Sequence, residues 1–571
     1  MLGFREVHVV SRMRVWCATL ILVGTPAAPA ELTPARIAGA QEEPQNWLTF
    51  FGNYGAWSYS GLGGINRGNV ARLAPAWTFS TGDKGLASAP LVIDGTLFLL
   101  TTAGKVYALD AADGRILWMH APEATPGSGP PRAALGMAAA FGMLFYVTAN
   151  NHLVAIDSKN GGEVWDVQIE DPVQCSCGPG WAPLLVKDKV IVGQASEAAH
   201  RGQISAFDAR TGRLAWRFFA IPGTGQPGHE TWPQELWRVG GGSSWYVGSY
   251  DTELNLIYWG IGNPSPMLGG HYAGDKRYTE SLVALDADTG EVKWYFQEIP
   301  NDKLDYDSVL EPVLIDATIG GRKRKLVLHS TKGGFAYLLD RVTGNFIHAF
   351  PFSDSINWTP GIGPDGKPLE PLLQLSDGRE TVVCPGLFGA RAGGHSSYSP
   401  HTGLWYTTSY EACTPMRPVE VAAPVEGQAF SAATYGKSAL PPGKAPYIAA
   451  FDPLTGARKW TVFTDGPNLS SLLATRGDVI FGGDVLGHFW ALDALSGAKL
   501  WSFNVGSGVT GIPISYSVNA REYIAIGVGP NAYSLILATD LLTAEQQVVM
   551  PPVGSTLYVF ALPPRTQGMQ P

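Results

Sequence analysis

The chain has 571 residues, of which 45% are hydrophobic, 11% aromatic and 16% charged. This composition excludes an intrinsically disordered protein, because charges are too few and aromatic side chains too many. The formal net charge of −9 excludes a protein that binds nucleic acid or anionic membranes through a basic surface. The 69 Gly, 42 Pro and 18 Trp favour many short strands joined by turns.

The first 30 residues have the pattern of a secretion signal. Two arginines precede an apolar run at 15–24, and residues 28–30 read Ala-Pro-Ala, a cleavage-site pattern. The apolar run is too short to span a bilayer. We therefore predict a signal peptide over 1–30, with 31–571 forming one domain of a soluble periplasmic protein. The alternative for the run is a buried first strand or helix.

One eleven-residue phrase recurs seven times along the chain. The first copy reads ALDAADGRILW at 108–118, and the others begin at 155, 206, 284, 338, 450 and 491. Its Asp-x-x-Thr-Gly centre predicts a tight turn between two strands, capped by the Asp side chain and with Gly at positive φ. The phrase closes on an aromatic residue that can wedge between neighbouring sheets: Trp118, Trp165, Trp216, Trp294, His348, Trp460 and Trp501.

The spacing of the phrase predicts an all-β fold, an eight-bladed β-propeller with tryptophan-docking motifs. Most copies are separated by roughly the 40–50 residues that a four-stranded blade needs. The long gap between His348 and Trp460 has room for two blades, and the segment SYSPHTGLWY at 397–406 supplies the eighth position. The alternative is an open stack of hairpins, which is disfavoured because closure removes exposed sheet edges.

Three carboxylates and one amide follow strand-like runs outside the repeated phrase. Glu197 closes GQASE, Asn263 lies in GIGNP, and Asp305 and Asp307 lie two apart in LDYD. Oxygen ligands of this kind suit a hard cation. Residues two apart in an extended segment face the same way, so both aspartates can face one ion. The alternative for each residue is an ordinary turn position.

Further motifs surround these candidates: INRGNV at 65–70, APLV at 89–92, GGGSSW at 240–245, SYD at 249–251, ELNL at 253–256, GNP at 262–264 and HSTKG at 329–333. Together with the repeats, they resemble the quinoprotein alcohol dehydrogenases of the methanol/ethanol dehydrogenase type. These enzymes use pyrroloquinoline quinone (PQQ). The resemblance extends from Trp47 to about Leu562, nearly the whole predicted mature chain.

The resemblance implies a role for each candidate. Glu197, Asn263 and Asp305 correspond to the metal ligands, and Asp305 also to the catalytic base. Trp245 corresponds to the aromatic floor on which the quinone stacks. The remaining cofactor-site residues that it implies are Ser243, Gly180, Ser196 and Lys332, the last beside the reactive carbonyl of the quinone.

Asp307 bears on the identity of the metal. An acidic residue two positions after the base resembles the lanthanide-using branch of the family, and an added carboxylate favours a trivalent over a divalent ion. The expected cofactors are thus PQQ and one metal ion, a lanthanide, with Ca²⁺ as the alternative. A solvated loop acid is the alternative for Asp307.

Several family positions are altered. The adjacent Cys-Cys pair that covers the quinone is absent, and the family's larger or polar residues are replaced by Leu135, Ala87, Gly180, Ala392, Leu469 and Pro530. Smaller side chains imply a pocket roomier than methanol requires. Cys384 and Cys413 match a family disulfide. For Cys175 and Cys177, two free thiols and a local disulfide both remain open.

The resemblance implies oxidation of a primary or secondary alcohol, bulkier than methanol, to an aldehyde or ketone by hydride transfer to metal-bound PQQ. No C-x-x-C-H occurs, so the expected electron acceptor is a separate soluble cytochrome c. One rival is a non-enzymatic propeller scaffold of the outer-membrane assembly type. Another is a calcium/PQQ sugar or polyol dehydrogenase. Both a monomer and a homodimer remain open.

Overall fold

The protein is described from a computed structural model. The structure describes residue 3 and residues 31–122, 135–196, 200–269, 274–375, 378–420, 425–428 and 430–564. The predicted signal peptide at 1–30 and the candidate ligand Glu197 lie outside the described residues. The chain separates into two units, Met1–Glu31 and Leu32–Pro571, and every element below belongs to the second. Among the described residues, no helix is long and apolar enough to cross a membrane.

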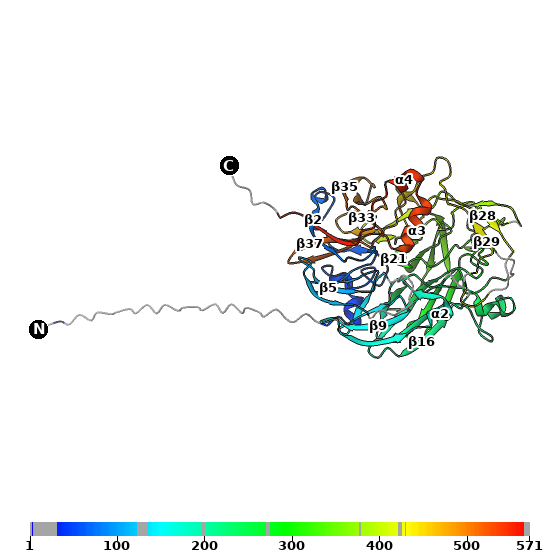
Figure 1. Cartoon of the computed structure of the whole chain (residues 1–571), viewed down its shortest axis with the longest axis horizontal. Helices are drawn as coiled ribbons and strands as arrows, with labels where there is room; N and C mark the ends of the chain where they lie inside the picture. Colours follow the sequence, from blue (N-terminus) through cyan, green and yellow to red (C-terminus); the bar gives the residue numbers. More distant parts are fainter. Residues whose placement is uncertain are drawn as a thin grey trace. The chain divides into compact units, whose positions relative to one another are not determined.

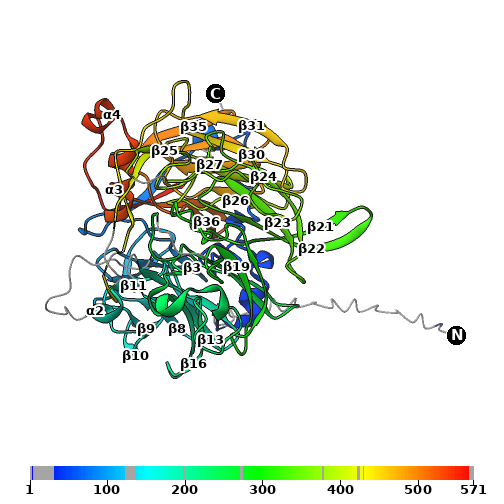
Figure 2. The same cartoon turned by 90° about the vertical axis from the view of Figure 1, so that its right-hand side faces the viewer.

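Antiparallel sheets of four strands dominate the second unit (Figures 1 and 2). The first two sheets contain β3 (Leu91–Ile93), β4 (Thr96–Leu100), β5 (Val106–Asp110) and β6 (Ile116–His120), then β7 (Ala138–Ala140), β8 (Met143–Val147), β9 (His152–Asp157) and β10 (Glu163–Gln168). The next two contain β12 (Leu184–Val186), β13 (Lys189–Val192), β15 (Gln203–Asp208) and β16 (Leu214–Phe219), then β17 (Ser249–Asp251), β18 (Leu256–Ile261), β19 (Ser281–Asp286) and β20 (Val292–Gln297).

Three further sheets follow in the second half of the chain. The first two contain β21 (Val313–Ile319), β22 (Arg322–Ser330), β23 (Phe335–Asp340) and β24 (Phe346–Pro351), then β26 (Ser397–Ser399), β27 (Leu404–Ser409), β30 (Tyr447–Phe451) and β31 (Arg458–Phe463). The third contains β32 (Leu473–Thr475), β33 (Val479–Gly483), β34 (His488–Asp493) and β35 (Lys499–Asn504), with β1 (Tyr59–Ser60) added in parallel beside β32.

The eighth sheet joins the two ends of the described fold. It contains β36 (Ile514–Val518), β37 (Arg521–Val528), β38 (Thr556–Ala561) and β2 (Ala74–Ser80). β2 pairs with β38 across nearly the whole chain, from Ala74 opposite Ala561 to Ser80 opposite Thr556. This pairing ties the first and last strands of the described fold into one sheet.

The eighth sheet corrects one prediction. The long gap between His348 and Trp460 does not hold two blades; it holds a single four-stranded sheet, whose first hairpin is SYSPHTGLWY. The rest of the gap consists of loops and a small sheet, β25 (Thr381–Val383), β28 (Thr414–Pro418) and β29 (Ala433–Tyr435). The eighth sheet lacks the repeated phrase because its strands come from both chain ends.

The remaining elements are short, apart from one helix. A second small sheet pairs β11 (Cys177–Pro179) with β14 (Gln194–Ser196). The helices are α1 (Pro34–Ala38), α2 (Pro172–Cys175), α3 (Ala532–Leu541) and α4 (Ala544–Val548), with 3₁₀ turns at Ala40–Glu42, Val70–Arg72, His229–Thr231 and Gln234–Val239. In Figure 2, α2, α3 and α4 lie on one side, and the β21–β22 hairpin projects from the opposite side.

The repeated phrase forms the turn that its sequence predicts. In the third copy, Oδ1 of Asp208 accepts hydrogen bonds from the backbone N–H groups of Arg210 (3.1 Å) and Thr211 (2.9 Å), and Gly212 has φ +69°. Both features were expected from an Asp-capped turn closed by Gly.

The closing aromatic residues reach the next sheet. Nε1 of Trp118 donates to the carbonyl of Ser158 (3.2 Å), the residue after the turn aspartate of the following copy. A Cβ at Gly161 of that turn would lie 2.7 Å from the ring of Trp118. The same link recurs for Trp165 to Ala209, Trp216 to Ala287, Trp294 to Arg341, His348 to Pro453, Trp460 to Ala494 and Trp501 to Leu73.

The hydrophobic core lies between neighbouring sheets. Its largest cluster joins the first four sheets through fully buried residues such as Leu91, Leu144, Ile191 and Ile257. First strands such as β7, β12 and β17 are buried throughout, whereas fourth strands such as β6 and β10 are largely exposed. These sheets extend from a buried first strand towards a more exposed fourth strand, as sheets packed around a common centre do.

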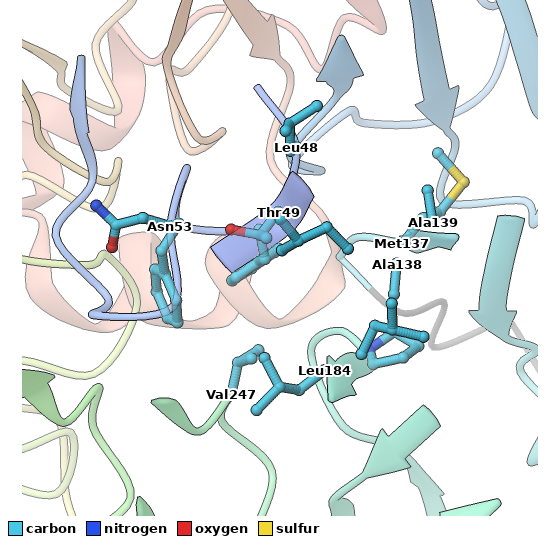
Figure 3. A pocket seen from close by; sticks show the side chains of 13 residues that line it. Leu48, Thr49, Asn53, Met137, Ala138, Ala139, Leu184 and Val247 are labelled. Atoms are coloured by element: carbon cyan, nitrogen blue, oxygen red, sulfur yellow. The ribbon is translucent and has the colours of Figure 1, made fainter. Parts of the chain in front are cut away.

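One small apolar cavity lies within this core. It is lined by side chains of the segment 48–53, of β7 and of β12, and by Val247 (Figure 3). Its volume of about 20 Å³ has room for about one water molecule. None of the candidate site residues lines it, so we assign this cavity to packing.

Candidate functional site

Asp305 and Asp307 lie in a short loop that is tightly held by its neighbours. The carboxylate of Asp302 accepts hydrogen bonds from the backbone N–H groups of Leu304 (3.1 Å) and Tyr306 (3.0 Å). Leu304 and Tyr306 are buried in a hydrophobic cluster, and the Tyr306 hydroxyl donates to the carbonyl of Pro385 (2.8 Å). Asp305 has φ +63°, in the left-handed region, so simple alternation along extended backbone does not set its direction. The contacts of both aspartates with Lys332 bring their carboxylates together.

Lys332 joins the two aspartates. Its Nζ lies 3.1 Å from Oδ2 of Asp305 and 2.7 Å from Oδ2 of Asp307. The three side chains are 5–10% exposed. Burial lowers the pKa of Lys332, but the two carboxylates raise it by more, so its pKa lies well above the ordinary value and the ammonium stays charged.

Asn263 lies against the same carboxylate. Its backbone N–H donates to Oδ1 of Asp307 (2.8 Å), and its side-chain Nδ2 donates to the carbonyl of Pro264 (3.0 Å). The side-chain oxygen is thus the atom that the amide can offer to a cation. A Cβ at Gly262 would collide with Oδ1 of Asp307 and approach Oγ of Ser243 to 3.0 Å, so only glycine fits there.

Trp245 borders the aspartates on another side. Its Nε1 donates to Oδ2 of Asp307 (3.3 Å), and its ring centroid lies 5.6 Å from that of Trp181. The carbonyl of Trp245 accepts a hydrogen bond from the N–H of Trp181 (2.8 Å). A Cβ at Gly180 would lie 3.3 Å from the Trp245 carbonyl and 3.0 Å from that of Gly193. The ring is only half-buried, so part of its surface remains accessible to a ligand.

Ser196 lies at the end of β14, opposite Cys177 of β11. Its hydroxyl donates to the carbonyl of Ser176 (3.2 Å), so it contacts the Cys175–Cys177 loop. Cys175 and Cys177 form a disulfide, which decides between the two alternatives left open by the sequence. Cys384 and Cys413 also form a disulfide, as the family resemblance implied.

Glu280 is a buried acid that the sequence analysis missed. It is fully buried, and neither carboxylate oxygen has a hydrogen-bond partner within the described part of the chain. Burial raises the pKa of Glu280 well above its ordinary value, and Asp302, Asp307 and Asp305 raise it further. The buried surroundings of Glu280 therefore favour its protonated form. One feature of the sequence could have drawn attention to Glu280: it is a charged residue directly before SLVAL, the apolar run of β19.

Helix α3 covers positions where the family resemblance predicted open space. Leu537 and Ala538 of α3 pack in one cluster with Ala392 and Leu469, two of the altered positions. The space at these two positions is thus taken by a helix of this chain.

Comparison with known proteins bears on the same residues. A family model described as glucose/ethanol/alcohol dehydrogenase, beta-propeller domain, matches residues 47–351, more than half of the chain. The chain belongs to the PQQ-dependent quinoprotein alcohol dehydrogenases. A second model, described as outer membrane protein assembly factor BamB, matches residues 444–527.

Relatives within the quinoprotein alcohol dehydrogenases match over nearly their full length. A lanthanide-dependent methanol dehydrogenase of Methylacidiphilum fumariolicum is 33% identical, covering 91% of this chain and 93% of its own. The quinoprotein alcohol dehydrogenase PedH of Pseudomonas putida is 31% identical, with 96% of each chain covered. A solved europium-containing methanol dehydrogenase is 31% identical and superposes with a TM-score of 0.86, covering 92% of this chain and all of that chain.

The donor set of this quinoprotein fits a hard cation. Asp305, Asp307 and the amide of Asn263 offer only oxygen ligands, the chemistry that Ca²⁺ and larger cations of the same kind require. Two buried carboxylates beside one ammonium leave a net negative charge. The half-buried ring of Trp245 offers the flat aromatic surface that a quinone needs.

Proposed function

We propose that this chain is an exported PQQ-dependent dehydrogenase for primary or secondary alcohols bulkier than methanol. The observation that carries the proposal is the bonded unit of Asp305, Asp307, Lys332 and Trp245. Lys332 contacts both carboxylates (3.1 and 2.7 Å), and Trp245 donates to Asp307 (3.3 Å). Asp305, Asp307, Lys332 and Trp245 are thus joined in one chain of contacts, through Lys332 and Asp307.

In this proposal, Glu197, Asn263, Asp305 and Asp307 hold the metal, and Trp245, Ser243, Gly180 and Ser196 form the cofactor site with Glu197 and Lys332. PQQ, when bound with its metal, supplies the two-electron oxidation of the alcohol. Asp305 orients the alcohol through its hydroxyl and takes the hydroxyl proton as general base. Lys332, held charged by both aspartates, stabilises negative charge that develops beside it. Burial of these groups excludes water and strengthens their mutual interactions.

We favour a lanthanide over Ca²⁺ because Asp307 adds a second buried carboxylate beside Asp305. Attraction scales with the product of the charges, so a trivalent ion gains more from each added carboxylate. The name of the relative from Methylacidiphilum fumariolicum, a lanthanide-dependent methanol dehydrogenase, agrees with this choice.

The organisation of the chain extends the proposal. Residues 1–30 act as a signal peptide, and 31–571 form one eight-bladed propeller in the periplasm, with the repeated tryptophans docking each blade on the next. A soluble cytochrome c accepts the electrons, since the chain has no C-x-x-C-H motif of its own.

The main rival is a non-enzymatic scaffold of the outer-membrane assembly type. The match of residues 444–527 to the BamB model favours shared repeats in that region. A scaffold has no use for two buried aspartates that face one lysine, because unneutralised buried charge destabilises a fold. A calcium/PQQ sugar or polyol dehydrogenase would share the site and differ in substrate and metal.

Reconstitution tests the proposal. The purified protein is loaded with PQQ and either La³⁺ or Ca²⁺, and reduction of an artificial acceptor dye is followed with a panel of alcohols and sugars. We expect alcohol-dependent dye reduction in the wild type and loss of at least about 100-fold in Asp305→Asn, since general-base catalysis contributes roughly 10²–10⁴-fold. Turnover of Asp305→Asn near the wild-type rate would remove Asp305 from the base role.

A further inference from the structure

Helix α3 is anchored at its C-terminal end. Leu537 and Ala538 are 0% and 1% exposed, packed against Ala392 and Leu469. Oδ1 of Asp540 accepts a hydrogen bond from the backbone N–H of Ser438 (3.2 Å). The position of the first turn of α3 is therefore set by a helix end that is fixed in the protein.

Tyr533 lies one turn before Leu537 and shares its helix face, because residues four apart are neighbours on a helix. Leu537 is fully buried, yet Tyr533 is 36% exposed. A tyrosine on the inward face of a helix stays this exposed when there is open space next to its ring. The ring of Tyr533 therefore borders an open space at the first turn of α3.

Residues of the proposed site lie across this space. The ring centroids of Tyr533 and Trp245 are 6.4 Å apart, with the ring planes inclined by 61°. Tyr533 thus lies beside the aromatic floor of the proposed site.

We propose that Tyr533 is a specificity-determining residue whose ring walls the space beside Trp245 and limits the size of the alcohol accepted. The inference rests on the proposed alcohol dehydrogenase function. A tyrosine ring is large and has few rotamers, so it makes a firm wall. A single added or removed methylene in such a pocket changes specificity by roughly 10–200-fold.

Substrate profiles of two Tyr533 variants test the proposal. The reconstituted holoenzyme is assayed for kcat/KM with straight-chain primary alcohols of increasing length and with 2-phenylethanol. We expect the ratio for bulky over short alcohols to rise roughly tenfold in Tyr533→Ala. Tyr533→Phe keeps the ring and should keep the wild-type ratio. Tyr435→Ala removes a tyrosine that is 55% exposed on β29 and serves as the matched control.

An unchanged ratio in Tyr533→Ala, or an equal loss with every alcohol, would overturn the proposal, because a merely structural residue lowers all rates together. A changed ratio in Tyr533→Phe would also overturn it, since the hydroxyl rather than the ring would then matter. A wild type that turns over no alcohol overturns the proposed function and this inference together. An active wild type with an unchanged ratio in Tyr533→Ala overturns this inference alone.

Discussion

Replacing Lys332 by methionine should destabilise the metal-free protein. Lys332 is 6% exposed, and its partners Asp305 and Asp307 are 10% and 5% exposed. Removing one partner of a buried ion pair costs about 3–5 kcal/mol, because the remaining charges stay buried without compensation. For the unit Leu32–Pro571, an unfolding entropy of about 2.1 cal/mol/K per residue converts this loss into a fall in Tm of about 3–4 °C.

The assay is a pair of thermal melts at pH 7, with and without La³⁺. The raised pKa of Lys332 means that its stabilising contribution is complete below the ordinary lysine value of about 10.4 and is lost only as the pH rises through the higher folded-state pKa. At pH 7 the effect is therefore fully developed. La³⁺ should recover the lost stability in Lys332→Met, because the ion supplies the positive charge that the aspartates lack.

The matched control is Lys293→Met, since Lys293 is 42% exposed and pairs with Glu291 on the surface. Exposed pairs contribute about 0–1 kcal/mol, so this variant should melt within about 1 °C of wild type. Equal melting of Lys332→Met and wild type would refute the buried ion pair. Failure of La³⁺ to stabilise Lys332→Met would refute the metal site at Asp305 and Asp307.

Two other predictions concern single acids. Asp307→Ala should shift dye-reduction activity from lanthanide towards Ca²⁺, because one carboxylate charge is removed. An unchanged ratio of the lanthanide activity to the Ca²⁺ activity would mean that Asp307 is an ordinary loop acid. Burial raises the pKa of Glu522 to about 7, although its carboxylate accepts a hydrogen bond from the N–H of Ile65 (2.8 Å). A raised pKa makes the charged form costly, so stability falls by about 3 kcal/mol as the pH rises from roughly 4.5 through 7. Glu522→Gln should flatten the melting temperature between pH 5 and 8, and a slope equal to that of wild type would contradict this account.

The local chemistry of the repeats was readable from the sequence. Asp208 and Gly212 form their turn because both effects act within five residues, through one side-chain hydrogen bond and one backbone angle. The two-residue spacing of Asp305 and Asp307 predicted that both face one site, and both do contact Lys332. The reason was wrong, because Asp305 has φ +63° and the segment is not extended there. The resemblance added Lys332 and Trp245, whose contacts with Asp307 the structure shows directly.

The tertiary structure decided what depends on distant pairing. The eighth sheet was misplaced because β2 and β38 lie at opposite ends of the chain and carry no repeated phrase. Glu280 could be recognised as a residue of interest only from the structure, because burial and the nearby Asp302 raise its pKa. In the sequence, Tyr533 has no feature that marks it as part of the site. The fold of α3 places its ring centroid 6.4 Å from that of Trp245. Turns and side-chain direction are local properties of the backbone, whereas burial, charge compensation and the walls of a site depend on which distant segments meet.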